Sequence, residues 1–278
     1  MYGCRPFVVM KEYVVAGCKI DIEKNIFLNE AWKKFIVHRG QIGSGDVLFK
    51  IFMKNPVSRH YGIYRGELEE ADSYILANHA DIVTWDSKWQ TGHVLNMETA
   101  AGMALMIQQV FYTHVVQRRI IQFHSSLIDM HGHGLMFLGP SGIGKTTQAE
   151  LWNRYRDALI INGDIVFVQE TESGFLGWGT PWHGSSPYCE NASVPVDALI
   201  VLKQAPENSI RELTGFEKVT AVSNNVFYPR WLENGMELCL DVLDHLLRVL
   251  PVYELSCRPD EEAVALTEKT IFGENRKW

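Results

Sequence analysis

Residues 135–150 read LMFLGPSGIGKTTQAE, and this stretch decides the fold of the chain. Its four leading apolar residues, Leu135–Leu138, predict a short buried strand, and the run from Thr146 to Arg156 predicts a helix. Between them, residues 139–146 match the pattern G-x-x-x-x-G-K-[ST] at every fixed position. A strand, a glycine-rich loop and a helix in this order form the context in which that pattern binds nucleotide phosphates.

Phosphate binding explains the residue types of the loop. A loop that closes around a phosphate turns its backbone N–H groups inward, which glycine permits, and the helix points its positive N-terminal end at the same anion. Lys145 adds a charge for the β- and γ-phosphates, and Thr146 places a hydroxyl for Mg²⁺. A glycine-rich turn with a chance lysine is the alternative. The predicted nucleotide contacts are Gly139, Ser141, Gly142, Ile143, Gly144, Lys145, Thr146 and Thr147.

The composition is that of an ordinary globular chain. Of its 278 residues, 46% are hydrophobic and 21% are charged, and the formal net charge is −7. This charge argues against a nucleic-acid partner or an anionic membrane, and no apolar run reaches the roughly 18 residues of a membrane span. The 5 cysteines are widely spaced and form no C-x-x-C, which argues against a disulfide framework or a zinc site. Without a signal-peptide pattern in the first residues, we expect a cytoplasmic protein.

The sequence predicts two domains, a β-rich domain at 1–95 and a nucleotide-binding catalytic domain at 96–278. The first contains short runs of β-branched and aromatic residues that are separated by turn-forming residues. We interpret it as a packing or substrate-presenting domain, in which the isolated His38, His60 and His79 are not ligands. Its predicted strands are 7–10, 13–16, 19–22, 47–52, 74–77 and 81–84, with turns at 16–17, 40–43 and 55–56 and a tryptophan-bearing loop or hairpin at 85–89.

A long helix opens the second predicted domain. Residues 97–119 place apolar side chains at helical spacing, with Asn96 as the predicted N-cap and Glu98 in the first turn. A hairpin follows, from a strand at 121–130 to the strand that precedes the phosphate loop. His131 and His133 in its turn suggest a metal pair, but without a further ligand nearby a plain turn is the preferred interpretation.

Two polar residues near the loop are the candidate catalytic groups. A strand at 158–161 ends in Asn162-Gly163-Asp164, and ligands of open α/β sheets lie beyond the carboxyl ends of strands. Asp164 is therefore predicted to hold Mg²⁺ or to accept the proton of an attacking hydroxyl, with a plain turn as the alternative. His124 lies across the hairpin from the loop-bearing strand, and it either faces the same pocket or is a hydrogen-bonded core histidine.

The remaining segments predict one functional loop and several regular elements. Residues 179–186 are too rich in Gly, Pro and Ser for regular structure, and Thr180 and His183 are their chemically useful members. Arg211 is a candidate for contacting the transferred phosphate. The predicted elements are a hairpin of 165–168 and 174–177, strands at 193–202 and 252–257, and helices at 241–250 and 259–271.

Several of these segments resemble the HPr kinase/phosphorylase family. The segment FHSSLID at 123–129, the loop GPSGIGKTT and a strand ending in Asp164 recur there in this order and spacing. The segments GTPWHG, ENSI and VYELSCRPDEEAV are similar to HPr-kinase-related proteins of peptide gene clusters, including the lasso-peptide precursor kinases. The resemblance covers roughly residues 120–270. It implies an α/β fold with the P-loop core that HPr kinases share with ATP-dependent PEP carboxykinases, preceded by a smaller β-rich N-terminal domain.

The resemblance implies roles for the matching positions, with ATP and Mg²⁺ as cofactors. Lys145 would bind the phosphates, Thr146 and Asp164 would hold the metal, and Asp164 would be the general base on a serine or threonine hydroxyl. His124 would lie beside the reacting phosphate. Family members usually carry two adjacent aspartates where this chain has Gly163-Asp164, so the second metal contact and the reverse, phosphorolytic reaction stay open. Because relatives are often oligomers, the resemblance also suggests a homo-oligomer.

Three functions stay open at this point. The first is a kinase that transfers the γ-phosphoryl group of ATP to a hydroxyl of a protein or peptide. The second is a small-molecule kinase or carboxykinase on the same core, which ranks lower because a di-anionic acid needs several basic residues. The third is a nucleotide-binding regulatory module with little catalysis, which the glycine at position 163 favours. From the end of the loop to residue 211, the basic residues are Arg154, Arg156, Lys203 and Arg211.

Overall fold

The computed structural model describes residues 8–37, 46–54 and 74–273. It divides the chain into two compact units, Met1–His114 and Val115–Trp278. The boundary that the sequence predicts, between residues 95 and 96, lies earlier, before a helix that the structure groups with the first unit. The turns predicted at 40–43 and 55–56, together with His38 and His60, lie outside the described residues.

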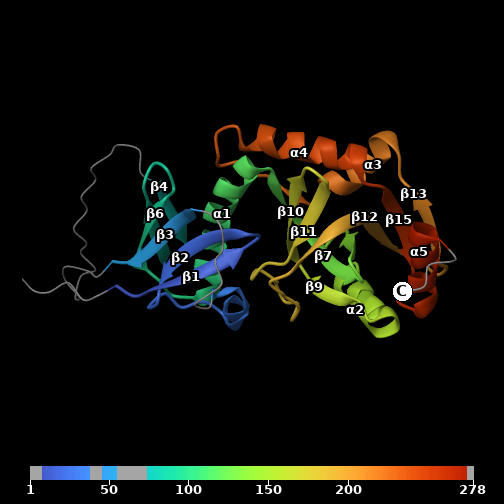
Figure 1. Cartoon of the computed structure of the whole chain (residues 1–278), viewed down its shortest axis with the longest axis horizontal. Helices are drawn as coiled ribbons and strands as arrows, with labels where there is room; N and C mark the ends of the chain where they lie inside the picture. The colour runs from blue at the N-terminus through green and yellow to red at the C-terminus, as the bar shows by residue number, and fades with distance from the viewer. Residues whose placement is uncertain (1–7, 38–45, 55–73, 274–278) are drawn as a thin grey trace, which may run out of the picture. The chain divides into compact units, whose positions relative to one another are not determined.

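The first unit contains a six-stranded mixed sheet with the strand order β1-β2-β3-β6-β5-β4 (Figure 1). The β2–β3 and β3–β6 pairs are parallel, and the other pairs are antiparallel. The predicted strands at 19–22, 47–52, 74–77 and 81–84 coincide with β2, β3, β4 and β5. The separate strands predicted at 7–10 and 13–16 were wrong, because a single strand, β1, runs through residues 10–15, and β6 and a short 3-10 helix, η1, were not predicted. The elements are β1 (Met10–Val15), β2 (Cys18–Glu23), η1 (Glu30–Phe35), β3 (Val47–Met53), β4 (Tyr74–Asn78), β5 (Asp81–Trp85) and β6 (Thr91–Asn96).

Helix α1 (Ala100–Val115) starts later than the sequence predicts. The Thr99 hydroxyl caps it by accepting a hydrogen bond from the Gly102 backbone N–H at 3.0 Å. Asn96, the predicted N-cap, instead ends β6 and donates its side-chain amide to the Ala80 carbonyl at 2.6 Å. The N-cap prediction was therefore wrong, because the strand before the helix continues through Asn96. At the other end of α1, His114 Nε2 lies 2.9 Å from the Trp89 carbonyl oxygen, which ties the helix to the first unit.

The second unit contains a nine-stranded sheet, in which seven strands follow the order β11-β10-β7-β8-β12-β15-β13 and β9 and β14 also pair with β7. A short 3-10 helix, η2 (Val116–Arg118), precedes it. The predicted hairpins and the strands at 193–202 and 252–257 are confirmed, whereas β13 and β14 were not predicted. The strands are β7 (Ile120–Met130), β8 (His133–Leu138), β9 (Leu159–Asn162), β10 (Ile165–Thr171), β11 (Gly174–Trp178), β12 (Ser193–Gln204), β13 (Ser209–Glu212), β14 (Val226–Phe227) and β15 (Val252–Cys257).

Strand β7 changes its partners on both edges at the same point. Its first half pairs with β10 and β14, up to the pair His124–Ile165. Its second half pairs with β8 and β9, starting from the pair Ser125–Leu138. The backbone N–H groups at the change donate to loop carbonyls, His124 to Asn225 at 2.8 Å and Ser125 to Asp164 at 2.9 Å. Three segments that are distant in sequence therefore converge on His124.

Four strands of this sheet end at one edge. Because β8 and β9 are both antiparallel to β7, they run in the same direction. Strand β12 is parallel to β8, and β15 is parallel to β12. The segments that follow these strands thus share the carboxyl edge of the sheet, where ligands of α/β folds bind.

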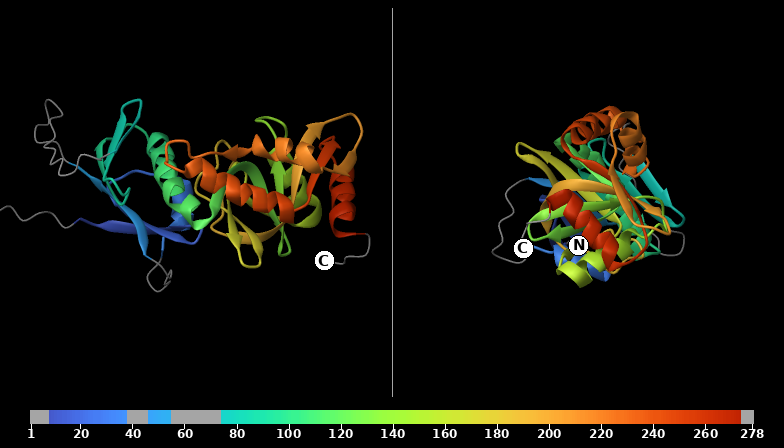
Figure 2. Two further views of the ribbon diagram at one scale, coloured as in Figure 1. Left: turned by 90° about the horizontal axis from the view of Figure 1, so that it is seen from above. Right: turned by 90° about the vertical axis from the view of Figure 1, so that its right-hand side faces the viewer.

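The helices of the second unit are α2 (Lys145–Arg156), α3 (Gly215–Ser223), α4 (Gly235–Val249) and α5 (Glu261–Phe272). Figure 1 shows α2 and α4 on opposite sides of the strands of this unit, and in Figure 2 α4 runs across them. The α2–α5 side encloses an apolar core to which Phe137, Trp152 and Leu255 contribute fully buried side chains. Helix α3 was not predicted, and α4 begins before the predicted 241. No helix in the described ranges has the length and apolar character needed to span a membrane.

Candidate functional site

The glycine-rich loop connects β8 to α2 at the carboxyl edge of the sheet, as the sequence predicts. Gly139 and Gly144 have φ angles of 140° and 114°, which a residue with a side chain adopts only at a cost. The Gly139 N–H donates to the Asn225 side-chain oxygen at 2.8 Å. The carbonyl of the same asparagine accepts from the His124 N–H, so Asn225 connects the loop to the centre of β7.

Lys145 is the first residue of α2, and its side chain is 6% exposed. Its ammonium group donates to the carbonyl oxygens of Gly139 at 3.0 Å and Pro140 at 3.3 Å. Burial lowers the pKa of Lys145, and the nearby carboxylate of Asp164 opposes this shift. The ammonium group of Lys145 therefore lies in the loop, where phosphate oxygens can replace the two carbonyl oxygens that it contacts. It also lies close enough to Asp164 for the two charges to interact.

The first turn of α2 is attached to two strands. The Thr146 hydroxyl donates to the Gly163 carbonyl at 3.2 Å, which brings it next to Asp164. The Ser126 hydroxyl donates to the Lys145 carbonyl at 2.9 Å and fixes the same turn to β7. Ser126 is fully buried, and the sequence offered no signal for this role.

Asp164 and His124 form an ion pair when the imidazole is protonated, with His124 Nε2 3.0 Å from Asp164 Oδ1. Each of the two side chains is 28% exposed, so the pair remains accessible from solvent. The structure thus brings together the two candidate catalytic residues, which lie on opposite sides of the phosphate loop in the sequence. The aromatic ring of Phe227 lies 6.3 Å from the His124 ring, centroid to centroid.

Asn162 positions Asp164, and sequence reasoning treated it only as part of a turn. It is fully buried, and its side-chain oxygen accepts from the backbone N–H groups of Asp164 at 2.8 Å and Ile165 at 3.0 Å. Its side-chain amide donates to the carbonyl oxygens of Thr180 at 3.0 Å and Trp182 at 3.3 Å. One side chain therefore fixes both the candidate catalytic residue Asp164 and the following glycine-rich loop.

The loop at 179–188 closes over Gly163 and Asp164. A Cβ atom on Gly163 would lie 1.9 Å from the Ser186 hydroxyl oxygen, so this serine occupies the space of the missing side chain. A Cβ atom on Gly184 would lie 2.2 Å from Asp164 Oδ2, so only a glycine fits against that oxygen. Thr180 is fully buried, and its hydroxyl donates to the Ile165 carbonyl at 2.8 Å, which attaches the loop to the start of β10. His183 contacts the Ser186 carbonyl through Nδ1.

The structure does not bring Arg211, His131 or His133 to this site. Arg211 lies on β13, which β12 and β15 separate from β8, and it forms ion pairs with Glu217 and Glu254. His133 begins β8 at the opposite edge of the sheet, where its Nδ1 lies 3.2 Å from Asp197 Oδ2. This second His–Asp pair resembles the first in spacing and exposure but lies away from the loop.

The residues around the loop fit a nucleotide with a divalent cation. Gly142 and Gly144 have positive φ angles, and no atom lies within 4 Å of the positions that their Cβ atoms would take, so the loop faces open space. Among the described residues, no group of three or more His, Cys, Asp and Glu side chains is arranged to hold a metal ion. Mg²⁺ commonly uses one or two protein ligands together with phosphate oxygens, and Thr146 with Asp164 can supply that number.

A cavity of about 350 Å³ lies on the other side of the loop. The loop residues 142–144, the first turn of α2 and the ends of β12 and β15 line it. In the strand order, β12 and β15 lie on one side of β8 and β7 with β9 on the other. The cavity and the Asp164–His124 pair therefore flank the phosphate loop from opposite sides.

Comparisons with known proteins do not assign this chain to a family. No protein-family model matches the chain, and no curated protein matches it. Among solved structures, the chain is similar to the Hpr(Ser) kinase/phosphatase from Coxiella burnetii, with a TM-score of 0.32 and 11% sequence identity. The match covers 54% of this chain and 95% of that chain. At this TM-score the likeness supports no conclusion about the activity of this chain.

Proposed function

We propose that this chain is an ATP- and Mg²⁺-dependent kinase that transfers the γ-phosphoryl group to a serine or threonine hydroxyl of a protein or peptide. The observation that carries the proposal is the pair of His124 Nε2 and Asp164 Oδ1, 3.0 Å apart beside the loop that contains Lys145. Transfer to a hydroxyl requires a cation for the phosphates and a base for the hydroxyl proton within reach of each other. This edge of the sheet offers both.

The loop and the first turn of α2 bind the phosphates in this proposal. ATP supplies the phosphoryl group, and Mg²⁺ neutralises the charge of its oxygens. Lys145 exchanges the carbonyl oxygens of Gly139 and Pro140 for phosphate oxygens, which are stronger acceptors for a buried cation. Thr146 and Asp164 are the protein ligands of the metal.

Asp164 also acts as the general base. It accepts the proton of the acceptor hydroxyl while the hydroxyl oxygen forms its bond to the γ-phosphorus. The bond from the γ-phosphorus to the oxygen shared with the β-phosphate breaks, and its electron pair leaves with ADP. The proton goes to the carboxylate of Asp164, whose Oδ1 faces His124 and whose Oδ2 lies against Gly184.

His124 is a positioning residue in this mechanism. Its imidazole holds Oδ1 of Asp164, and its own strand position is fixed where β7 changes partners. Catalysis of phosphoryl transfer depends mainly on positioning and charge, so a fixed carboxylate is worth more than a mobile one.

A nucleotide-binding module with little catalysis is the second candidate, and position 163 favours it. Ser186 fills the space beside Gly163, so Asp164 has no neighbouring carboxylate there for a second metal contact. A protein or peptide acceptor and a homo-oligomer are part of the kinase proposal.

Mass spectrometry of the protein incubated with Mg-ATP and candidate acceptors tests the proposal. The acceptors are free serine, HPr and any short peptide encoded beside the gene. We expect one acceptor to gain about 80 Da, the mass of a phosphoryl group. Asp164→Asn should lower the transfer rate by about 10²- to 10⁴-fold while Mg-ATP affinity stays within a few-fold.

Asp197→Asn is the matched control, because it changes the other exposed His–Asp pair of the same sheet. It should leave transfer unchanged. Undiminished transfer by Asp164→Asn would remove this residue from the mechanism. ATP binding without modification of any acceptor would instead favour the binding module.

A further inference from the structure

The cavity beside the phosphate loop is placed where the nucleoside of a bound nucleotide must go. One end of the loop faces Asp164, where the proposed function puts the γ-phosphate. Residues 142–144 of the loop border the cavity, which lies on the side of β12 and β15. A nucleotide extends from its γ-phosphate to its base, so a chain of phosphates along the loop delivers the base to the cavity side.

The cavity walls suit a flat, largely apolar group. Leu202 and Cys257 lie at the ends of β12 and β15, and Ile143 projects from the loop. Burial raises the pKa of the Cys257 thiol, so this residue is uncharged at neutral pH, whereas Lys203 and Arg258 add positive charges to the lining. Pockets for small molecules combine such apolar walls with a few fixed polar groups.

Gln148 supplies the first fixed polar group. Its side chain is 3% exposed and lies in the cavity wall on α2. Its amide nitrogen donates to Cys257 Sγ at 3.2 Å, whereas its Oε1 is buried and has no hydrogen-bond partner in the described part of the chain. A buried acceptor without a donor is costly, so this oxygen points to a donor that a ligand brings.

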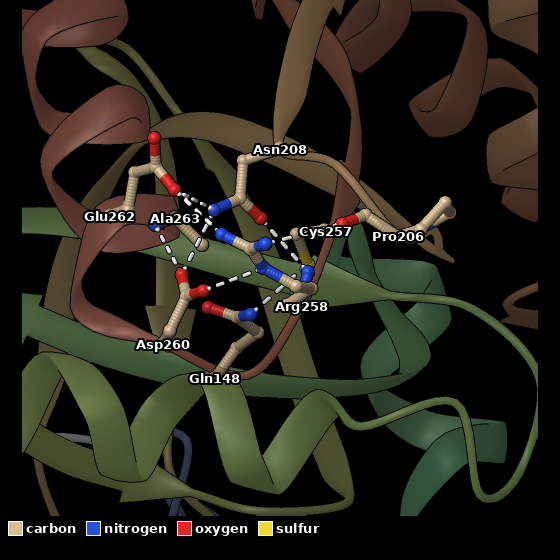
Figure 3. Close-up of polar contacts among 8 residues, drawn as sticks. All are labelled: Gln148, Pro206, Asn208, Cys257, Arg258, Asp260, Glu262 and Ala263. Carbon is tan, nitrogen blue, oxygen red and sulfur yellow. Dashed lines mark hydrogen bonds and ion pairs between the residues drawn. The ribbon is translucent and has the colours of Figure 1, made fainter.

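Arg258, which lines the cavity, supplies the second group. Figure 3 shows its polar contacts. Its guanidinium donates to Asp260 at 2.9 Å, to Glu262 at 2.8 Å and to the Pro206 carbonyl at 3.3 Å. Asn208 completes the network by donating to both carboxylates and accepting from the Arg258 N–H. Several acceptors thus hold the guanidinium plane in one orientation, and such a plane stacks well on an aromatic ring.

We propose that this cavity, which we call the nucleoside pocket, binds the adenine base of the ATP substrate. Arg258 covers the face of the base, and Gln148 Oε1 accepts a hydrogen bond from its exocyclic amino group. The assignment rests on the proposed function for the direction of the phosphates. The assignment predicts that the pocket selects adenine over other bases. A base with a carbonyl in place of the amino group leaves Gln148 Oε1 unpaired, and sites that recognise a ligand by hydrogen bonds reject such analogues strongly.

Binding of ATP, ITP and inorganic tripolyphosphate, without acceptor, tests the proposal by calorimetry. ATP and ITP differ in the group that Gln148 is proposed to recognise, and in the neighbouring N1, which is an acceptor in ATP and an N–H donor in ITP. We expect the wild-type chain to bind ATP about 10-fold or more tightly than ITP, as for one hydrogen bond lost to a buried group. Gln148→Met keeps the length of the side chain and should bring the ATP-to-ITP ratio close to 1, while tripolyphosphate affinity stays unchanged.

Arg258→Ala should weaken both nucleotides by a similar factor and leave tripolyphosphate unaffected. Arg248→Ala is its matched control, an exposed arginine in an i,i+4 ion pair with Asp244, and it should change neither. Equal affinities for ATP and ITP in the wild-type chain, or a preference for ITP, would overturn the assignment while phosphate binding stands. Failure to bind even tripolyphosphate would overturn the proposed function as well.

Discussion

The two sides of the phosphate loop hold their polar groups by different means. On the Asp164 side, buried asparagines and backbone groups fix the functional residues, as Asn162 does for Asp164 and Asn225 for Gly139. On the side of the nucleoside pocket, an exposed network of Asp260 and Glu262 orients Arg258. Buried hydrogen bonds are costly to break, whereas exposed ion pairs contribute little to stability. Substitutions on the first side should therefore affect stability and turnover together, and those in the exposed network of the second side should affect nucleotide affinity with little loss of stability.

Lys145→Ala gives the largest expected effect on affinity, because we propose that this residue, which lies between the two sides, binds the phosphates. Charge-assisted hydrogen bonds of about 1.5–3 kcal/mol correspond to a loss of roughly 10- to 100-fold in affinity. The loss should be the same for ATP, ITP and tripolyphosphate when measured by calorimetry, so the ATP-to-ITP ratio should not change. Lys269→Ala, at the end of α5, is the control. Tripolyphosphate binding that survives the Lys145 substitution would show that the loop does not use this lysine.

Gly163→Ala should disturb the Asp164 side of the loop and leave the nucleoside pocket unchanged. Its Cβ atom would lie 1.9 Å from the Ser186 hydroxyl oxygen and 2.5 Å from the Ser186 Cβ, so the loop at 179–188 must move away from Asp164. Overpacking of this kind costs about 1–3 kcal/mol, which corresponds to a fall in Tm of roughly 2–10 °C. Phosphoryl transfer should fall as well, while the ATP-to-ITP ratio stays at the wild-type value.

The double variant Gly163→Ala/Ser186→Gly tests the cause. It removes the side chain that the new methyl group meets, so Tm and transfer should both recover in part. A double variant as impaired as the single one would mean that the damage does not arise from contact with Ser186.

The smallest expected effect is a pH dependence of stability from Lys145. Burial lowers its pKa in the folded state, so between that value and the ordinary lysine pKa the unfolded chain binds more protons than the folded chain. The contribution of Lys145 to the free energy of unfolding therefore rises with pH through this window. Urea unfolding from neutral pH to about pH 10 measures this contribution as the difference in the free energy of unfolding between the wild type and Lys145→Met. The ionisation of the tyrosines affects both proteins equally and cancels in this difference. A constant difference would mean that the pKa of Lys145 is the same in both states.

Local patterns in the sequence predicted the strand, loop and helix at 135–156 and the hairpin before them, because each depends on neighbouring residues. The sequence left His124 open between facing the pocket and being a core histidine, and the structure places it beside Asp164. Asn96 shows the limit of this reasoning. Its residue type suits an N-cap, but the strand β6 continues through it and leaves the cap to Thr99.

The supporting residues of the site could not be predicted from local pattern. Asn225 lies 86 residues from Gly139, and nothing in its neighbourhood marks it as the partner of the loop. Ser186 was part of a loop noted for Thr180 and His183, yet only its packing over Gly163 gives it a role. Gln148 and Arg258 come together through the parallel pairing of β12 with β8 and β15, which the sequence does not specify residue by residue.

The meeting of distant segments at His124 also constrains the order in which the site can form during synthesis. A nascent chain that has emerged as far as the end of α2 contains every fixed position of the phosphate-binding pattern. It still lacks Asp164, and the acceptor for the Gly139 N–H arrives only with Asn225, after β12, β13 and α3. The loop and its proposed catalytic neighbours can therefore complete their contacts only after Asn225 has been synthesised, when most of the chain has been made.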